Sequence, residues 1–164
     1  AGCWQIRFDA GHSPGHMSLT DSARKFHICV DFLLPRISPN ISARLRDLDD
    51  DMLADYLHYL ESMTDCPTDW LIIPGHDWPY FGGGSRAAQL IVHHAARLDQ
   101  LFGMIGDKPV STNDAMLALF PFDMTEHEIF FASCEARAHL NHLVTTGHLQ
   151  NLGRKNDVDL FAKC

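Results

Sequence analysis

The chain has 164 residues, of which 46% are hydrophobic and 21% charged, and its formal net charge is -8. This composition supports a buried core and excludes an intrinsically disordered chain. No apolar run approaches the roughly 20 residues that cross a bilayer, so no transmembrane helix is expected. The acidic balance argues against a general nucleic-acid binder. Five scattered cysteines without a C-x-x-C pair indicate reduced, mostly buried thiols in a cytoplasmic protein.

The first third of the chain predicts β-structure. Side chains alternate between apolar and polar over residues 4–9, which predicts a half-buried strand. A loop follows, with the sequence Gly11-His12-Ser13-Pro14-Gly15-His16. Residues 17–20 and 26–30 then predict the two strands of a β-hairpin, and Asp31 comes directly after the second strand.

The middle of the chain predicts two helices and one short strand. Two prolines make residues 34–40 an irregular connection. Apolar residues at helical spacing predict a helix over about 50–63, and residues 70–73 predict a buried strand that ends at Pro74-Gly75-His76. A second helix is expected over about 86–104, with Ser85 as its N-cap.

A second unit is expected from residue 108 onward, so the predicted domains are residues 1–107 and 108–164. Ser111 and Asp114 resemble a capping pair for a helix that runs to about residue 120. A longer helix is predicted over about 125–146, followed by a β-hairpin whose turn lies within 153–157. Helices followed by a terminal hairpin are typical of a winged helix.

Three side chains that could bind metal share one structural position. His12, Asp31 and His76 each follow a predicted strand, and loops at strand ends gather at one edge of a sheet. Two imidazoles and a carboxylate suit zinc or another first-row cation, and a carboxylate can bridge two such ions. Taken singly, each residue also has an ordinary interpretation, as a turn histidine or a strand-end hydrogen-bond acceptor.

The order Gly-His-Ser-Pro-Gly-His, strand, Asp31 and Pro-Gly-His76 resembles the C-terminal half of the metallo-β-lactamase fold hydrolases. The resemblance covers nearly the whole chain. It implies an α+β fold, namely the C-terminal half of an αββα sandwich with a small winged-helix-like extension.

The resemblance also implies a role for each site residue. His12 would bind one metal ion, His76 would bind the second, and Asp31 would bridge the two. Zinc is the expected metal, with manganese or iron as further possibilities. The superfamily usually has Gly before the bridging Asp, whereas this chain has Val30.

Two further residues near the site are candidates for supporting roles. His16 is interpreted as supporting His12 or capping its loop. Tyr80 could line a substrate pocket, although a packed aromatic residue in a turn fits the sequence equally well.

The superfamily's His-x-His-x-Asp-His motif is absent from this sequence. We therefore expect a C-terminal fragment of a longer metal-dependent hydrolase of an ester, thioester or related bond, which uses metal-activated hydroxide and is inactive on its own. Alternatives are a non-catalytic interaction or regulatory piece, and a phosphodiesterase or ribonuclease with the same metal site.

The partners expected are a small-molecule substrate and either the missing N-terminal half or a second copy of the chain. No membrane partner is expected. Nucleic-acid binding is disfavoured, because residues 108–164 contain five Lys and Arg against seven Asp and Glu.

Overall fold

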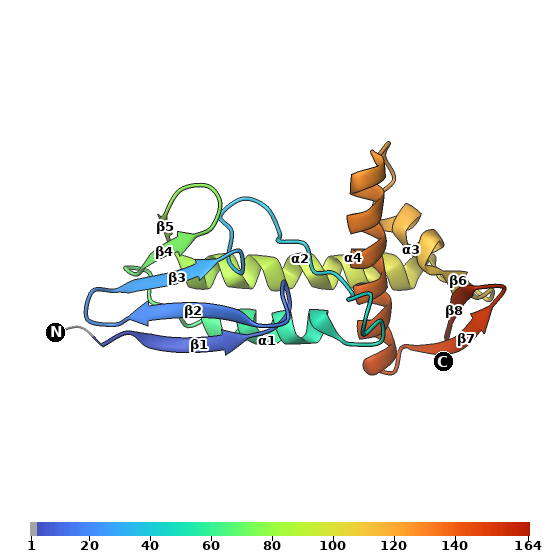
Figure 1. The fold of residues 1–164 in the computed structure, drawn as a ribbon, viewed down its shortest axis with the longest axis horizontal. Helices are drawn as coiled ribbons and strands as arrows, with labels where there is room; N and C mark the ends of the chain where they lie inside the picture. Colours follow the sequence, from blue (N-terminus) through green and yellow to red (C-terminus); the bar gives the residue numbers. More distant parts are fainter. Residues whose placement is uncertain (1–2) are drawn as a thin grey trace. The chain divides into compact units, whose positions relative to one another are not determined.

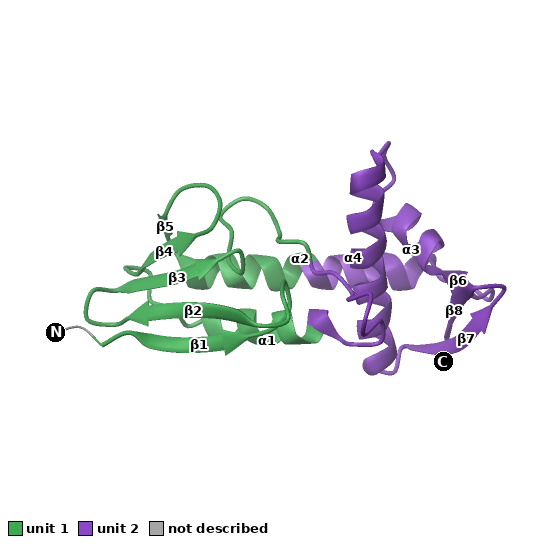
Figure 2. Cartoon of the chain, in the orientation of Figure 1, with its two compact units in different colours: residues 1–40, 54–93 green, residues 41–53, 94–164 purple. Residues whose placement is uncertain are grey.

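The computed structural model describes residues 3–164, and the chain divides into two compact units (Figure 2). Unit 1 comprises residues 1–40 and 54–93, and unit 2 comprises residues 41–53 and 94–164. Residues 41–53 and 94–107 thus lie in unit 2. The expected domain boundary at residue 108 stays a prediction.

Unit 1 contains a five-stranded sheet in the order β1-β2-β3-β4-β5 (Figure 1). Its strands are β1 (Gln5–Asp9), β2 (His16–Asp21), β3 (Phe26–Val30), β4 (Leu71–Pro74) and β5 (Tyr80–Phe81). Only β3 and β4 pair in parallel. The first four strands confirm the sequence prediction, whereas β5 has two residues and gave no alternating pattern to detect.

Two helices, α1 (Met52–Met63) and α2 (Gly83–Met104), confirm the two predicted in the middle of the chain. The expected N-cap at Ser85 is wrong, because α2 begins at Gly83. A Cβ on Gly83 would lie 2.7 Å from the Ile72 side chain, and one on Gly84 would lie 2.4 Å from the Thr64 carbonyl oxygen. These glycines allow the helix to start in close contact with its neighbours rather than forming a flexible turn.

Unit 2 contains β6 (Val110–Ser111), α3 (Thr112–Leu119), α4 (Glu126–Thr145), β7 (Leu149–Lys155) and β8 (Val158–Lys163). Its antiparallel sheet has the order β6-β8-β7. The predicted capping pair is confirmed, since Ser111 and Asp114 form a capping box, and Thr125 and Glu128 form another at the start of α4. The helices and final hairpin appear as predicted, while the winged-helix assignment stays an interpretation.

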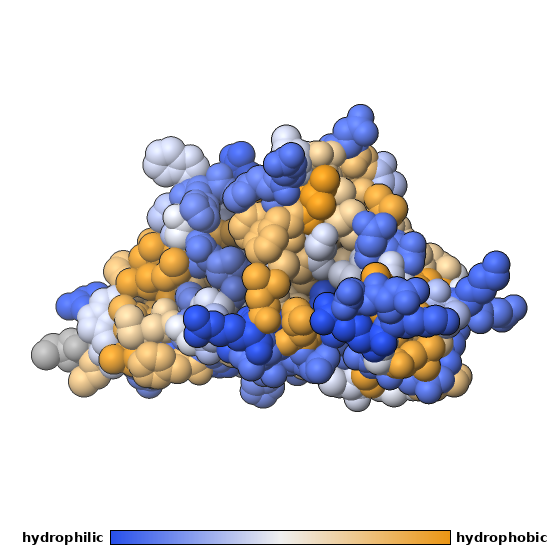
Figure 3. Space-filling model, turned by 45° about the vertical axis from the view of Figure 1, so that its right-hand side comes forward, coloured by the Kyte–Doolittle hydropathy of each residue, from blue (hydrophilic) through white to orange (hydrophobic). Residues whose placement is uncertain are grey.

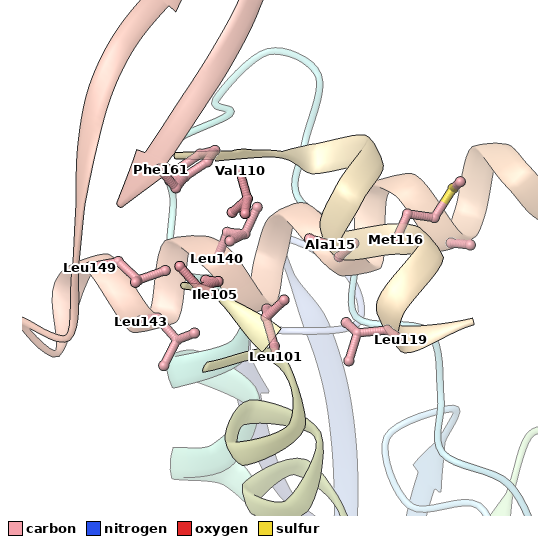
Figure 4. Packing of buried hydrophobic residues seen from close by; sticks show 12 residues of the cluster. Leu101, Ile105, Val110, Ala115, Met116, Leu119, Leu140, Leu143, Leu149 and Phe161 are labelled. Atoms are coloured by element: carbon pink, nitrogen blue, oxygen red, sulfur yellow. The ribbon is translucent and has the colours of Figure 1, made fainter. Parts of the chain in front are cut away.

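A single apolar cluster forms the core of unit 2 (Figure 4). It joins the end of α2 to α3, α4 and the small sheet, for example through Leu101, Leu140 and Phe161. None of the helices in residues 3–164 is long and apolar enough to cross a membrane.

The sheet of unit 1 has an unusual distribution of polarity. Its buried face carries polar side chains such as His16, Ser18 and His27. Its opposite face exposes large apolar side chains, including Ile6, Phe8 and Met17. The space-filling view of one face of the molecule shows hydrophobic residues exposed among hydrophilic ones (Figure 3). A sheet that ordinarily met water on this face would show the reverse pattern.

Part of the buried polar face of this sheet is hydrogen-bonded to α1, whereas His16 Nε2 and Ser18 Oγ have no hydrogen-bond partner within residues 3–164. His27 Nε2 lies 3.1 Å from the Tyr59 hydroxyl, and His27 Nδ1 lies 2.9 Å from Thr20 Oγ1. The Arg7 guanidinium donates to Ser62 and lies over the Tyr59 ring. The helix therefore supplies hydrogen-bonding partners as well as apolar contacts.

The cysteines only partly match the prediction of buried thiols. All five are free, but Cys29 alone is buried, while Cys3 and Cys164 are exposed.

Candidate metal centre

The three predicted metal ligands lie together at one edge of the sheet of unit 1. His12 is in the loop between β1 and β2, while Asp31 and His76 follow β3 and β4. Because β3 and β4 are parallel neighbours, their carboxyl ends bring Asp31 and His76 together. Asp31 Oδ2 lies 3.7 Å from His12 Nε2, and Asp31 Oδ1 lies 3.6 Å from His76 Nε2.

These distances fit a carboxylate in which each oxygen binds a separate cation together with one imidazole. Two ligands held at about 2.1 Å by a tetrahedral ion are separated by about 3.4 Å. Direct hydrogen bonds would be shorter than the observed distances. Asp31 Oδ1 is also buried and has no hydrogen-bond partner within residues 3–164. An unpaired buried carboxylate oxygen is costly, so this donor set fits a cation on each side of Asp31.

The position of Asp31 depends on Gly75. A Cβ on residue 75 would lie 2.3 Å from Asp31 Oδ1 and 3.0 Å from a Val30 methyl carbon. The Gly75 amide donates to the Val30 carbonyl at 2.7 Å, which fixes the close approach of the two chain segments. Glycine at position 75 is therefore required by the space beside the carboxylate.

His12 is oriented by the backbone. Its Nδ1 lies 2.8 Å from the Asn40 carbonyl oxygen, which can only accept a hydrogen bond. Nδ1 is therefore the donor in this contact, which leaves Nε2 on the side of Asp31, where it could bind a cation. Such an outer hydrogen bond is typical of metal-ligating histidines. Preceding Gly11 has φ 137° and lies against Tyr56, so it places the loop close to α1.

The backbone of Val30 accounts for the glycine that the resemblance leads us to expect before Asp31. Its φ is +43°, in the left-handed region that β-branched residues avoid. The β3–β4 register also shifts between Ile28 and Val30. This irregularity turns the chain so that Asp31 is directed from the end of β3 toward the site. Val30 adopts the left-handed backbone conformation despite its Cβ.

The two supporting candidates, His16 and Tyr80, have packing contacts. The His16 ring stacks on Phe32 at a centroid distance of 3.8 Å, and burial lowers the pKa of His16. Tyr80 donates to the Leu33 carbonyl at 3.0 Å, and burial raises its pKa. His16 thus supports the segment after Asp31 through Phe32, and Tyr80 fastens that segment to β5. Their functional roles stay predictions.

Sequence reasoning did not identify Arg86 as a supporting residue. Its guanidinium donates to the carbonyls of Leu34 and Ile37, at 2.7 and 2.9 Å, and so fixes the loop beyond Asp31. No motif marks such a contact, because backbone carbonyls carry no sequence signal. Across residues 3–164, no group of three or more His, Cys, Asp or Glu side chains is placed to hold one metal ion. Each cation would therefore receive only two donors from the three ligands described here.

Comparisons with known proteins identify the family. A family model described as "Metallo-beta-lactamase-like, C-terminal domain" matches residues 98–164. The solved structure of a β-lactamase domain protein from Burkholderia ambifaria is 34% identical over 100% of this chain, with a TM-score of 0.95. The chain belongs to the metallo-β-lactamase superfamily. It corresponds to the C-terminal half, as the ordered histidine and aspartate motifs predicted.

A second metallo-β-lactamase superfamily structure shows the same relationship. The metallo-β-lactamase family protein from Thermus thermophilus is 26% identical over 98% of this chain, with a TM-score of 0.82. This chain covers 49% of each of the two solved proteins. Curated proteins gave no match.

Proposed function

We propose that this chain contributes half of a two-cation hydrolytic site, in which Asp31 bridges the cations, His12 holds one and His76 holds the other. The observation that carries the proposal is the buried Oδ1 of Asp31, which has no hydrogen-bond partner among residues 3–164, in a carboxylate whose two oxygens face different imidazoles. Imidazole and carboxylate donors favour zinc, and manganese or iron accept the same set.

The chain's own residues hold and orient the ligands. The Asn40 carbonyl fixes which nitrogen of His12 faces Asp31, and Gly75 leaves space for the carboxylate. Arg86 and Tyr80 restrain the loop that follows Asp31. When bound, the cations would lower the pKa of a coordinated water and stabilise negative charge on the substrate. The proposed reaction is hydrolysis of an ester, thioester or related bond in a small molecule.

We also propose that polypeptide outside this sequence completes the site. Two donors per cation are too few for a stable site, and the matched solved proteins are about twice as long as this chain. The same polypeptide would cover the apolar sheet face that contains Ile6, Phe8 and Met17. On its own, the chain would then serve only as an interaction piece, a role favoured by the lack of a three-donor group in residues 3–164.

Zinc binding tests the site directly. In competition with a fluorescent chelator, we expect weak zinc binding by the chain that is lost together in His12→Ala, His76→Ala and Asp31→Asn. His58→Ala is the matched control, because His58 is exposed on α1 in the same unit. Zinc binding that survives all three substitutions would refute the proposed ligands. In a protein that also contains the missing half, the same substitutions should abolish hydrolysis of a thioester substrate.

A further inference from the structure

Three buried polar side chains on the inner face of the sheet of unit 1 each have an atom without a hydrogen-bond partner in residues 3–164. The atoms are Asp9 Oδ2, His16 Nε2 and Ser18 Oγ. The Asp9 side chain and His16 are each 8% exposed, and Ser18 is 1% exposed. Burying a polar group without a hydrogen bond is costly, so each of these atoms calls for an explanation. We call the three residues the inner polar cluster.

The strand register places the inner polar cluster at one spot, where β1 and β2 lie side by side (Figure 1). Asp9 on β1 pairs with His16 on β2, and Arg7 pairs with Ser18. Directly paired residues share a face of a sheet, as do residues two apart on one strand. The Cβ atoms of directly paired residues are about 4.5–5.5 Å apart, a separation that one small molecule can bridge.

The neighbouring polar side chains of this face already have partners within unit 1. His27 Nε2 lies 3.1 Å from the Tyr59 hydroxyl. Arg7 Nε donates to Asp9 Oδ1 at 2.7 Å, and Arg7 Nη2 lies 2.6 Å from the same oxygen. Within β1, β2 and β3, the buried side-chain atoms that lack a partner all belong to the inner polar cluster. The missing partner is therefore local to this cluster.

The charges around the cluster favour water over a cation. The charge of Asp9 is already balanced by Arg7, so a cation would add uncompensated positive charge in a buried place. Only two of the three side chains are of the kinds that bind zinc. Burial lowers the pKa of His16, which favours a neutral ring with one acceptor nitrogen. Water can donate to two acceptors and accept from a hydroxyl, and buried waters make about three hydrogen bonds.

We propose that one water molecule binds in the inner polar cluster, where it donates to Asp9 Oδ2 and His16 Nε2 and accepts from the Ser18 hydroxyl. The His16 ring stacks on Phe32 at a centroid distance of 3.8 Å, and Phe32 directly follows Asp31. The water therefore fixes the ring on which this segment packs. Asp9 and Ser18 are then positioning residues for Asp31, a role that rests on the proposed function.

A crystal structure of the full chain tests the water directly. We expect a water oxygen about 2.6–3.2 Å from Asp9 Oδ2, His16 Nε2 and Ser18 Oγ. In solution, ¹⁵N NMR of the histidine side chains should show His16 neutral with its proton on Nδ1, since Nε2 accepts from the water. A direct bond from Ser18 to Asp9 or His16 without water, a cation at this position, or a proton on His16 Nε2 would overturn the proposal.

Variants of Ser18 test the positioning role. Ser18→Ala removes the hydroxyl that donates to the water, whereas Ser18→Thr keeps it, and Ser85→Ala changes an exposed serine of the same unit as the control. By chelator competition, zinc affinity should fall at least about threefold in Ser18→Ala and stay within about twofold of the original in Ser18→Thr and Ser85→Ala. The nuclear Overhauser effect from a long-lived water to the residue 18 amide should weaken only in Ser18→Ala.

These measurements separate the water site from the metal centre. If the original chain holds the water but binds no zinc, the proposed function fails while the water site stands. Equal zinc affinity in Ser18→Ala and Ser85→Ala overturns the positioning role. The absence of a long-lived water from the original chain overturns the water site whatever the zinc affinity.

Discussion

At the scale of single residues, the candidate metal centre depends on space as much as on its proposed ligands. Asp31 can lie between two imidazoles only because residue 75 lacks a side chain and residue 30 accepts a left-handed backbone. The Asn40 backbone carbonyl accepts a hydrogen bond from His12. The Arg86 guanidinium donates to backbone carbonyls of the loop that follows Asp31. The site is thus built mainly from backbone geometry around three chemically active side chains.

Gly75→Ala tests the role of space. The added Cβ would lie 2.3 Å from Asp31 Oδ1, so the carboxylate must move. We expect zinc affinity to fall at least about tenfold and the free energy of unfolding to fall by about 1–3 kcal/mol. Chelator competition and urea denaturation measure the two effects. Gly15→Ala is the control, since its Cβ would meet nothing within 4 Å. Equal zinc affinity in the two variants would contradict this account of Gly75.

At the scale of elements, sequence patterns predicted most of the fold. Alternation identified β1 and β2, an apolar run identified β3, and helical spacing of apolar residues identified α1. The two-residue strands β5 and β6 escaped detection because they are defined by their partners. The second helix was expected from about residue 86, whereas Gly83 and Gly84 already begin α2 because their neighbours leave no room for side chains.

The candidate site was predictable only in part. Its three ligands follow strands, which placed them at a common sheet edge before any distance was known. Tyr80 and His16 could be noticed from the sequence, but their contacts with Leu33 and Phe32 depend on how the loop after Asp31 folds back. The contribution of Arg86 was hidden for the same reason.

The polar layer between β3 and α1 makes the stability of unit 1 depend on pH. Burial lowers the pKa of His27 to about 4 from 6.5, so between these values the unfolded chain takes up a proton that the folded chain excludes. Its contribution is complete above pH 6.5 and is lost as the pH falls to about 4, a difference of about 3 kcal/mol.

Urea denaturation followed by tryptophan fluorescence measures this effect, because Trp4, Trp70 and Trp78 all lie in unit 1. His27→Gln should flatten the dependence between pH 7 and pH 4.5, and His58→Gln, at an exposed position, should leave it unchanged. An unchanged profile in His27→Gln would refute the assignment to His27.

In unit 2 the pH dependence has the opposite sign, since burial raises the pKa of Glu135 to about 7 from 4.5. The contribution of Glu135 to stability is present below pH 4.5 and is lost as the pH rises through 7.

Within unit 2, Arg137 joins α4 to the segment before α1. This buried side chain bonds Asp159 at 2.6 Å, Asn141 at 2.9 Å and Asp49 at 3.0 Å, and its guanidinium lies over the Phe161 ring. The main electropositive group on α4 is therefore occupied by contacts within unit 2.

Arg137→Ala should lower the free energy of unfolding of unit 2 by about 3–5 kcal/mol, because the substitution leaves Asp159 without its partner. Asp49→Ala should cost less than about 1 kcal/mol, since the Asp49 side chain is 85% exposed. Urea denaturation followed by far-ultraviolet circular dichroism is the measurement, because unit 2 contains no Trp or Tyr among its residues. Similar losses in the two variants would contradict the dominant role of the Asp159 contact.

At the scale of the whole molecule, the sheet of unit 1 presents its apolar face to solvent. Phe8 is 73% exposed and Ile6 59%, and they pair across the ladder with Met17 and Leu19. Contiguous apolar area of this kind marks a surface that is covered in the working protein. The proposal that further polypeptide packs here follows from this pattern.

Phe8→Ser combined with Ile6→Thr tests the exposed face. We expect the double variant to bind several-fold less of a fluorescent hydrophobic dye than the original chain, with circular dichroism unchanged. Leu117→Ser with Leu45→Thr removes comparable exposed apolar side chains in unit 2 and serves as the control. Dye binding that falls only in the control would show that the sheet face is not the main apolar surface.

The three proposed metal donors are divided between two cations. If each cation takes one imidazole and one oxygen from this half and its other ligands from the second half, neither half alone holds the ion firmly. Metal binding and association of the two halves are then thermodynamically linked, so each bound cation stabilises the contact between the halves. A strong chelator would remove the cations and also weaken the contact between the two halves. Loss of metal would then be detected first as weaker association of the halves.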